Sequence, residues 1–167
     1  MATIKAGRIF CAFLDLIAAS EGTCSHPLTR ADGYDVIVSG VDGHHIFTDY
    51  STHPFALGRP PVCVRASIPP LLSTASGRYQ LIWPTWEALK GIIHAGTFSP
   101  QNQDFAALRL LDECHASDMI RGGKIDLAIY ACNETWASFP GNLYKQGGKP
   151  IEWLLETYAT LLEAQGV

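Results

Sequence analysis

An amphipathic stretch near the N-terminus constrains the fold of this chain more than any other feature. Its large apolar side chains recur at the spacing of one helix face: Phe10, Phe13, Leu14 and Ile17. Gly22 then supplies the left-handed residue with which helices commonly end. We therefore predict an amphipathic helix of a folded domain, with Glu21 as its last residue.

Glu21 is the most informative residue of this helix, because it follows Ile17 by four positions and so lies on the apolar face. Such a carboxylate is either paired with a cation or placed at the edge of a cleft. In a cleft, burial and the negative end of its own helix raise its pKa. A carboxylic acid that stays protonated near neutral pH is what a general acid needs. A partly solvated glutamate without a chemical role is the alternative that spacing alone leaves open.

The composition excludes several classes of protein. Of the 167 residues, 47% are apolar and 17% are charged, which is typical of a globular domain rather than a disordered chain. The formal charge of −4, without a long basic run, argues against a nucleic-acid partner. The five cysteines show no CxxC spacing, so we expect no disulfide framework, no metal site and no other cofactor, and synthesis in a reducing compartment.

The first twenty residues have some features of an export signal. Lys5 and Arg8 precede an apolar run, but Asp15 interrupts that run and the helical periodicity continues through it. We therefore interpret this segment as a domain helix. No stretch of the sequence is long and apolar enough for stable insertion into a membrane.

A small β region is predicted after the first helix. Residues 34–39 and 45–50 have strand propensity and are joined by turn residues, so they form an antiparallel hairpin. Residues 51–72 carry five of the ten prolines, from which we expect irregular structure over most of this stretch. A loop of this length suggests a lip over a cleft, and a surface excursion without a role is the alternative.

Helices are predicted for most of the remaining chain. Apolar side chains at helical spacing mark four segments, at about 84–96, 100–111, 125–136 and 150–162, with a shorter piece around Met119. A helix, a hairpin and then several helices make an α+β arrangement. We expect one domain, 1–167, with a mainly helical lobe, a small antiparallel β-hairpin lobe at about 33–82, and an active-site cleft between them with Glu21 at the junction.

Several segments of the chain, in this order, resemble the lambda endolysin family of phage lytic transglycosylases, which have a lysozyme-like fold. No single segment is decisive, but their joint order and spacing from about Phe10 to Gln146 make the resemblance specific. The segments are Ala12–Thr23, Gly33–Gly40, Phe47–Ser51 with His53-Pro54, Ser73-Thr74 with Gly77–Leu81, Phe98–Pro100 with Gln103-Asp104, and Trp136–Ser138 with Pro140-Gly141, Tyr144 and Gln146.

The resemblance implies cleavage of the β-1,4 bond between N-acetylmuramic acid and N-acetylglucosamine in peptidoglycan. The product would carry a 1,6-anhydromuramic ring, formed without water, and Glu21 would be the single acid and base. One carboxylate is sufficient because the C6 hydroxyl of the sugar itself attacks C1, whereas a hydrolase normally needs two carboxylates.

Six further side chains are expected to contact the glycan. The resemblance implies five of them, and Asn133 is added because it lies one turn before Trp136 in the predicted helix. For the two tyrosines, packing in the core or at the rim is the alternative. The six are Ser51, Tyr79, Gln80, Asn133, Tyr144 and Gln146.

The resemblance also implies how the protein is used. We expect peptidoglycan glycan strands as its substrate, a monomer, and storage in the host cytoplasm until lysis. A separate membrane-permeabilising holin would then give it access to the cell wall. The proline-rich stretch looks longer than in the family, and the chain is acidic although its substrate is an anionic polymer, so the first lip and the affinity are expected to differ.

Two other functions stay open. One is a hydrolytic lysozyme that uses Glu21 together with Asp35 or Asp49, both on the predicted hairpin, although a solvated or turn-forming role suits each aspartate as well. The other is a peptidoglycan-binding module without catalysis.

Overall fold

The computed structural model describes residues 1–141 and 148–166, and the chain divides into two units. The first unit comprises Met1–Glu21 and Ala107–Val167, and the second comprises Gly22–Ala106. One boundary therefore falls directly after Glu21, and the other falls inside helix α3 (Pro100–Glu113).

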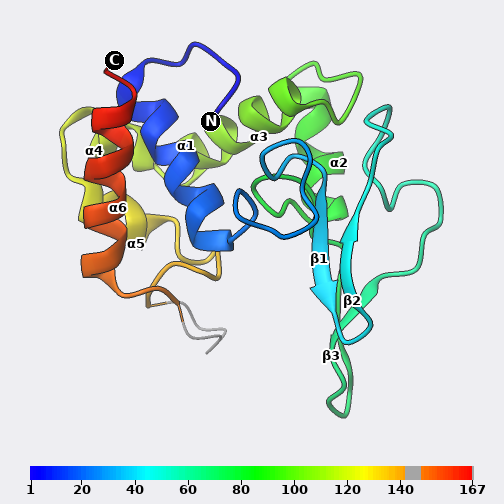
Figure 1. Ribbon diagram of the computed structural model, residues 1–167. Helices are drawn as coiled ribbons and strands as arrows, with labels where there is room; N and C mark the ends of the chain where they lie inside the picture. The colour runs from blue at the N-terminus through cyan, green and yellow to red at the C-terminus, as the bar shows by residue number, and fades with distance from the viewer. Residues whose placement is uncertain (142–147, 167) are drawn as a thin grey trace. The chain divides into compact units, whose positions relative to one another are not determined.

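The first unit is helical and is built around α1 (Arg8–Glu21), the blue helix of Figure 1. Nine of the 14 residues of α1 are buried, and the helix packs against α6 (Ile151–Ala164) and α4 (Ala116–Arg121). The end of α3 and α5 (Ile125–Ala131) complete the unit. The predicted helix is confirmed, with Glu21 as its last residue and Gly22 in the left-handed region at φ 73°.

Asp15, which interrupts the apolar run of α1, is buried in the first unit and holds two distant parts of the chain. Its carboxylate accepts hydrogen bonds from the backbone N–H of Ala2 at 2.8 Å and from Gln165 Nε2 at 2.9 Å. A buried carboxylate needs such donors to offset the loss of water. The N-terminal segment is therefore tied to α1, which confirms a domain helix.

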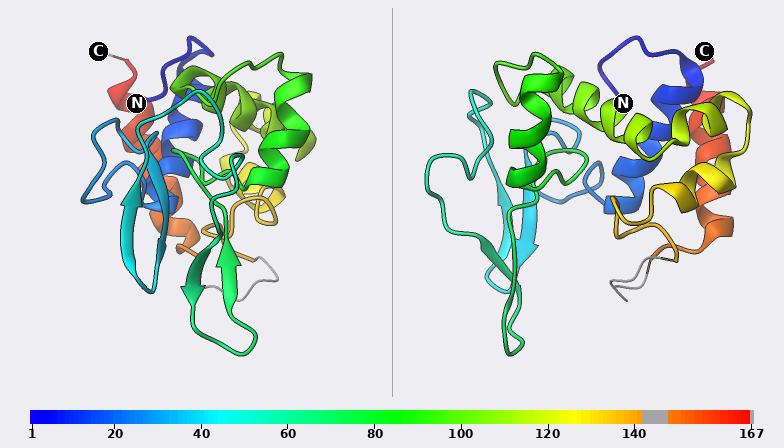
Figure 2. Two further views of the ribbon diagram at one scale, coloured as in Figure 1. Left: turned by 90° about the vertical axis from the view of Figure 1, so that its right-hand side faces the viewer. Right: turned by 180° about the vertical axis from the view of Figure 1, so that it is seen from behind.

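The second unit contains four short strands and α2 (Trp83–Ile92). Strands β1 (Val36–Gly40) and β2 (Gly43–Ile46) pair antiparallel, with Val36 opposite Ile46, as the sequence predicts. Strands β3 (Val62–Arg65) and β4 (Leu71–Ser73) form a second antiparallel hairpin. Strand β3 packs beside β1, so the two hairpins lie side by side (Figure 2).

The second hairpin corrects the expectation that residues 51–72 are mostly irregular. Pro60 and Pro61 come directly before β3, and Pro69 and Pro70 come directly before β4. Proline is tolerated at strand ends, where no ladder hydrogen bond is needed from it. The prolines therefore frame this hairpin rather than prevent it, and irregular structure is confined to the rest of the stretch.

The later helices follow the prediction, except that two of them end earlier than expected. Helix α2 ends at Ile92, and α5 ends at Ala131 rather than near Trp136. After α5 the N–H groups of Asn133 and Thr135 bond to carbonyls three residues back, which tightens the chain into turns. Among the helices described here, none has both the length and the apolar character needed to cross a membrane.

Candidate active site

Glu21 lies at the C-terminal end of α1, where the segment after α5 reaches it. Ser138 Oγ donates a hydrogen bond of 2.6 Å to Glu21 Oε1, and the backbone N–H of Ser138 bonds to the same carboxylate. The Ser138 hydroxyl also lies 2.9 Å from Ser20 Oγ. Residues 118 positions apart are therefore joined around one carboxyl group within the first unit.

Two buried aromatic residues fix the position of Ser138. Trp136 and Phe139 are 2% and 0% exposed, and their rings lie 6.2 Å apart. Phe139 also makes an edge-to-face contact with Phe13 of α1 at 6.2 Å. Because Ser138 lies between these two anchors in the sequence, packing of their rings against the core holds its hydroxyl at Glu21.

Burial raises the pKa of Glu21 above its usual range, and the hydroxyl and backbone N–H of Ser138 lower it by a smaller amount. The partial negative charge at the C-terminal end of α1 acts in the same direction as burial. Burial thus favours the protonated form of Glu21, and the two donors of Ser138 stabilise the carboxylate after it loses its proton. Both properties suit a group that first gives a proton and then takes one.

The candidate glycan residue Gln80 lies in a tight loop of the second unit. Ser76 and Leu81 exchange backbone hydrogen bonds of 3.0 and 2.9 Å, so that residues 77–80 form the tip. Gln80 adopts φ 50°, which is uncommon for a residue other than glycine. Its amide nitrogen donates to the carbonyl of Gly77 at 3.0 Å. A strained backbone at a partly exposed amide is typical of a functional position.

Hydrogen bonds with buried polar side chains stabilise this loop. Gln103 Oε1 accepts from the backbone N–H of Arg78 at 2.9 Å. Asp104 Oδ1 accepts from the hydroxyls of Tyr34 and Tyr79, each at 2.6 Å. Tyr79 is 0% exposed, and its ring packs edge-on against Tyr34 at 6.3 Å. Of the two roles left open for Tyr79, its surroundings therefore favour packing in the core.

Gly77 is the position at which this loop tolerates least change, so Gly77→Ala is expected to destabilise the protein by about 2–4 kcal/mol. A Cβ there would stand 2.1 Å from Gln103 Oε1, and the backbone has φ +77°. Gly58→Ala is the matched control, because Gly58 has φ +82° and nothing within 4 Å of the added Cβ. Chemical denaturation would measure both variants, and equal losses would mean that contact with Gln103 contributes nothing.

Ser51 and the two alternative carboxylates take part in local turns of the second unit. The backbone N–H of exposed Ser51 donates to Asp49 Oδ1 at 2.8 Å, and the Ser51 N–H and hydroxyl together lower the pKa of Asp49. Asp35 is buried and accepts from the hydroxyl of Thr29 and the backbone N–H of Arg30. Both aspartates thus have the turn-forming role that the sequence left open for them.

The remaining predicted contacts lie in or near the segment that carries Ser138. Asn133 Nδ2 donates to the carbonyl of Pro140 at 3.3 Å, so in this structure its amide supports the chain after Ser138. The predicted contacts Tyr144 and Gln146 lie outside the described residues. Within the described ranges, no three His, Cys, Asp or Glu side chains gather in a way that could hold a metal ion.

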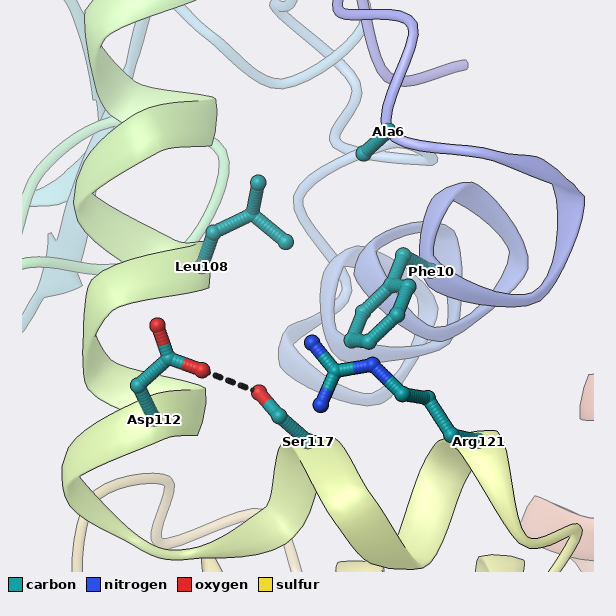
Figure 3. Close-up of a pocket in the computed structure, with 6 residues that line it drawn as sticks. All are labelled: Ala6, Phe10, Leu108, Asp112, Ser117 and Arg121. Atoms are coloured by element: carbon teal, nitrogen blue, oxygen red, sulfur yellow. Dashed lines mark hydrogen bonds between the residues drawn. The ribbon is translucent and has the colours of Figure 1, made fainter.

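A surface pocket of the first unit is lined by none of the predicted site residues (Figure 3). The guanidinium group of Arg121 lies over the ring of Phe10 at 5.3 Å, and Ser117 donates to Asp112. The lining residues are Ala6, Phe10, Leu108, Asp112, Ser117 and Arg121. Ser117 and Asp112 are bonded to each other, and Arg121 pairs with Asp118, so the polar groups of the pocket are engaged within the helical unit.

Sequence reasoning missed two residues at the site, Ser20 and Ser138. Ser20 is adjacent to Glu21, and Ser138 belongs to a segment already matched to the resemblance. A serine has no charge and gives no periodic signal in a sequence. Ser20 could have been noticed because it precedes Glu21 directly, whereas the approach of Ser138 to Glu21 is visible only in the structure.

Comparison with known proteins agrees with this fold. The family model described as Endolysin matches residues 11–164. The endolysin of Escherichia phage P2 is 45% identical over 161 residues, covering 96% of each chain. The endolysin of Escherichia phage lambda is 45% identical over 136 residues, covering 81% of this chain and 79% of its own.

Solved structures of bacteriophage lambda lysozyme are similar as well. One, complexed with a chitohexasaccharide, has a TM-score of 0.84 and 38% identity, covering 95% of this chain and 97% of its own. A second has a TM-score of 0.76 and 36% identity, covering 98% and 97%. With its lambda-lysozyme-like fold of helices and small antiparallel sheets, and with a family match over nearly its whole length, the chain belongs to the phage endolysin family.

Proposed function

We propose that this endolysin degrades peptidoglycan as a lytic transglycosylase that uses Glu21 as its only acid and base. The bond cleaved is the β-1,4 bond between N-acetylmuramic acid and N-acetylglucosamine, and the biological outcome is lysis of the host cell. The observation that carries this proposal is one carboxyl group of raised pKa, held by Ser138 at the end of α1. The oligosaccharide bound by the similar lambda lysozyme supports a glycan substrate.

In the proposed reaction, protonated Glu21 gives its proton to the glycosidic oxygen, and the bond from that oxygen to C1 breaks. The C6 hydroxyl of the muramic acid then attacks C1, and ionised Glu21 takes the proton of that hydroxyl. The enzyme ends as it began, and no water is consumed. An internal nucleophile has an effective concentration far above that of an external one, so a second carboxylate is not required.

The bonding of Asp35 and Asp49 supports a single-carboxylate mechanism. Asp35 is bonded to Thr29 and Arg30, and Asp49 is bonded to Ser51, so each carboxylate is engaged with residues of its own turn. Ser51, Gln80, Asn133, Tyr144 and Gln146 are proposed as contacts to the glycan. Dependence on a holin, storage in the host cytoplasm and the monomeric state stay predictions.

Mass spectrometry of the fragments released from purified peptidoglycan tests the proposal. Fragments ending in 1,6-anhydromuramic acid are expected from the native enzyme and not from Glu21→Gln. Fragments heavier by one water molecule would identify a hydrolase, and Asp35→Asn and Asp49→Asn would then show which aspartate is its second carboxylate. If the native protein binds peptidoglycan and releases nothing, it is a binding module and the proposal is wrong.

A further inference from the structure

A row of four oxygen atoms runs from Glu21 into the body of α1. Glu21 Oε1 is 2.6 Å from Ser138 Oγ, which is 2.9 Å from Ser20 Oγ, and Ser20 Oγ is 2.8 Å from the carbonyl oxygen of Ile17. All three separations are hydrogen-bonding distances. The row therefore has three gaps, each of which can hold one proton.

The number of protons available to these gaps depends on the charge of Glu21. When Glu21 is ionised, the two serine hydroxyls supply two protons, since the carboxylate and the Ile17 carbonyl only accept. The Ser138 proton then points to the carboxylate, and Ser20 can serve only one of its two neighbours. When Glu21 is protonated on Oε1, three protons fill three gaps, and every bond points away from Glu21 toward the Ile17 carbonyl.

We propose that Ser20 and Ser138 are positioning residues that form a reversible hydroxyl pair, supporting Glu21 both as an acid and as a base. This rests on the proposed function, in which Glu21 passes through both forms in each reaction. Ser138 accepts from the protonated acid and donates onward to Ser20. The Glu21 O–H then turns from Ser138 to the glycosidic oxygen and transfers its proton, after which Ser138 rotates and donates to the new carboxylate. Only the Ser138 hydroxyl has to rotate, because Ser20 can keep donating to the Ile17 carbonyl, and no proton moves along the row.

The second donor from Ser138, its backbone N–H, cannot turn in this way. It favours the ionised form of Glu21 in every state. Among the groups described at Glu21, the hydroxyls of Ser20 and Ser138 are thus the ones that can adapt to both forms. Without Ser20 as an acceptor, the Ser138 hydroxyl would also be left pointing at Glu21, and the acid form would lose its support.

Four other titratable groups of the first unit are engaged elsewhere: Asp15, Tyr158, Arg121 and Lys149. Asp15 bonds to Ala2 and Gln165, the Tyr158 hydroxyl donates to the Ile9 carbonyl at 3.4 Å, and Arg121 pairs with Asp118. Lys149 lies over the ring of Trp153. Among the described residues, burial and Ser138 account for the pKa shift of Glu21, and no charged side chain contributes to it.

The hydroxyl pair predicts shifts of opposite sign from two neighbouring serines. Ser20→Ala is expected to lower the pKa of Glu21, because it removes support from the acid form. Ser138→Ala is expected to raise it, because it removes a donor to the carboxylate. The pKa is read directly by ¹³C NMR titration of protein labelled at the glutamate carboxyl carbons, with the Glu21 signal assigned by its absence from Glu21→Gln.

The pH profile of peptidoglycan clearance gives a second readout. Above the native pKa, Ser20→Ala is expected to be roughly two- to tenfold less active than the native enzyme, the effect of losing one hydrogen bond to the acid form. Ser138→Thr keeps the hydroxyl and is expected to keep the native profile. Thr160→Ala is the control, since Thr160 makes an exposed hydroxyl-to-carbonyl bond to Glu156 within α6.

Two outcomes would overturn the hydroxyl pair: shifts of the same sign in Ser20→Ala and Ser138→Ala, or no shift in Ser20→Ala. Thermal unfolding shows whether each variant is folded, and Ser20→Thr replaces Ser20→Ala if that variant does not fold, with an unshifted pKa expected. The proposed function fails separately, if Glu21→Gln still releases anhydromuramic fragments. The NMR titration decides on the hydroxyl pair in either case, because it does not depend on activity.

Discussion

Replacing Glu21 by glutamine is expected to reduce peptidoglycan cleavage by roughly a thousandfold or more, because the proposed mechanism has Glu21 as its only proton donor and acceptor. Glutamine has the same shape, and its carbonyl oxygen can still accept from Ser138. The variant therefore removes the chemistry and keeps the packing. Clearance of a suspension of purified cell walls measures the loss.

The stability of the same variant checks the direction of the pKa shift. A carboxyl group with a raised pKa in the folded state favours folding fully below its unfolded pKa, and this contribution is lost as the pH rises through the folded pKa. Glu21→Gln has no such loss. It is therefore expected to gain in unfolding free energy relative to the native protein as the pH rises, and to lose that advantage in acid.

A carboxylate elsewhere in the first unit serves as the control for both measurements. Glu113 pairs with Arg109 at 3.1 Å on the exposed face of α3. Glu113→Gln is expected to keep full activity and to change the stability by less than about 0.5 kcal/mol. Retention of more than about a tenth of the native activity by Glu21→Gln would contradict the assignment of Glu21 as the only acid and base.

The largest expected effect on stability is that of Asp104→Ala, which should lower the free energy of unfolding by about 3–5 kcal/mol. The change leaves the hydroxyls of Tyr34 and Tyr79 without the carboxylate to which both donate. Buried polar groups that lose their partner cost more than the bond itself contributed. For a chain of this size, the midpoint of thermal unfolding should fall by roughly 8–15 °C.

Phenylalanine substitutions distinguish the cost of losing a hydrogen bond from the cost of leaving a buried hydroxyl without its acceptor. Tyr34→Phe and Tyr79→Phe should each cost about 1–2 kcal/mol, since the carboxylate keeps one donor. Combining both with Asp104→Ala removes the two hydroxyls that lack an acceptor. The triple variant should therefore recover part of the unfolding free energy that Asp104→Ala loses. If Asp104→Ala costs no more than one of the single phenylalanine variants, Asp104 does not organise this core.

Periodicity was sufficient to predict the helical part of this fold. Helix α1 ends at Glu21 as expected because apolar spacing and Gly22 are both local signals. The second hairpin was missed because the prolines around β3 and β4 are read as breakers wherever they stand, and their place at strand ends depends on pairing between strands.

The site was predictable only where a local pattern pointed to it. Glu21 stands out as a carboxylate on an apolar helix face. Ser138 does not, since its approach to Glu21 depends on how Trp136 and Phe139 pack in the folded unit. The direction of the Tyr79 side chain depends on the loop that Gly77 and Gln80 close with positive φ angles, and Gln80 gives no sign of this in the sequence.

The division of the chain has a consequence for the order in which a ribosome completes the two units. The second unit, Gly22–Ala106, is continuous, whereas the first needs residues 107–167 to cover α1. At a translation rate of 5–20 residues per second, α6 is complete roughly 3–12 s after Ala106 has been added. During this time the apolar face of α1 is not covered by α6. Ser138 follows Glu21 by 117 residues, so Glu21 gains this partner long after it has itself been synthesised. A chain interrupted before Ser138 is thus expected to contain Glu21 but not to cleave peptidoglycan.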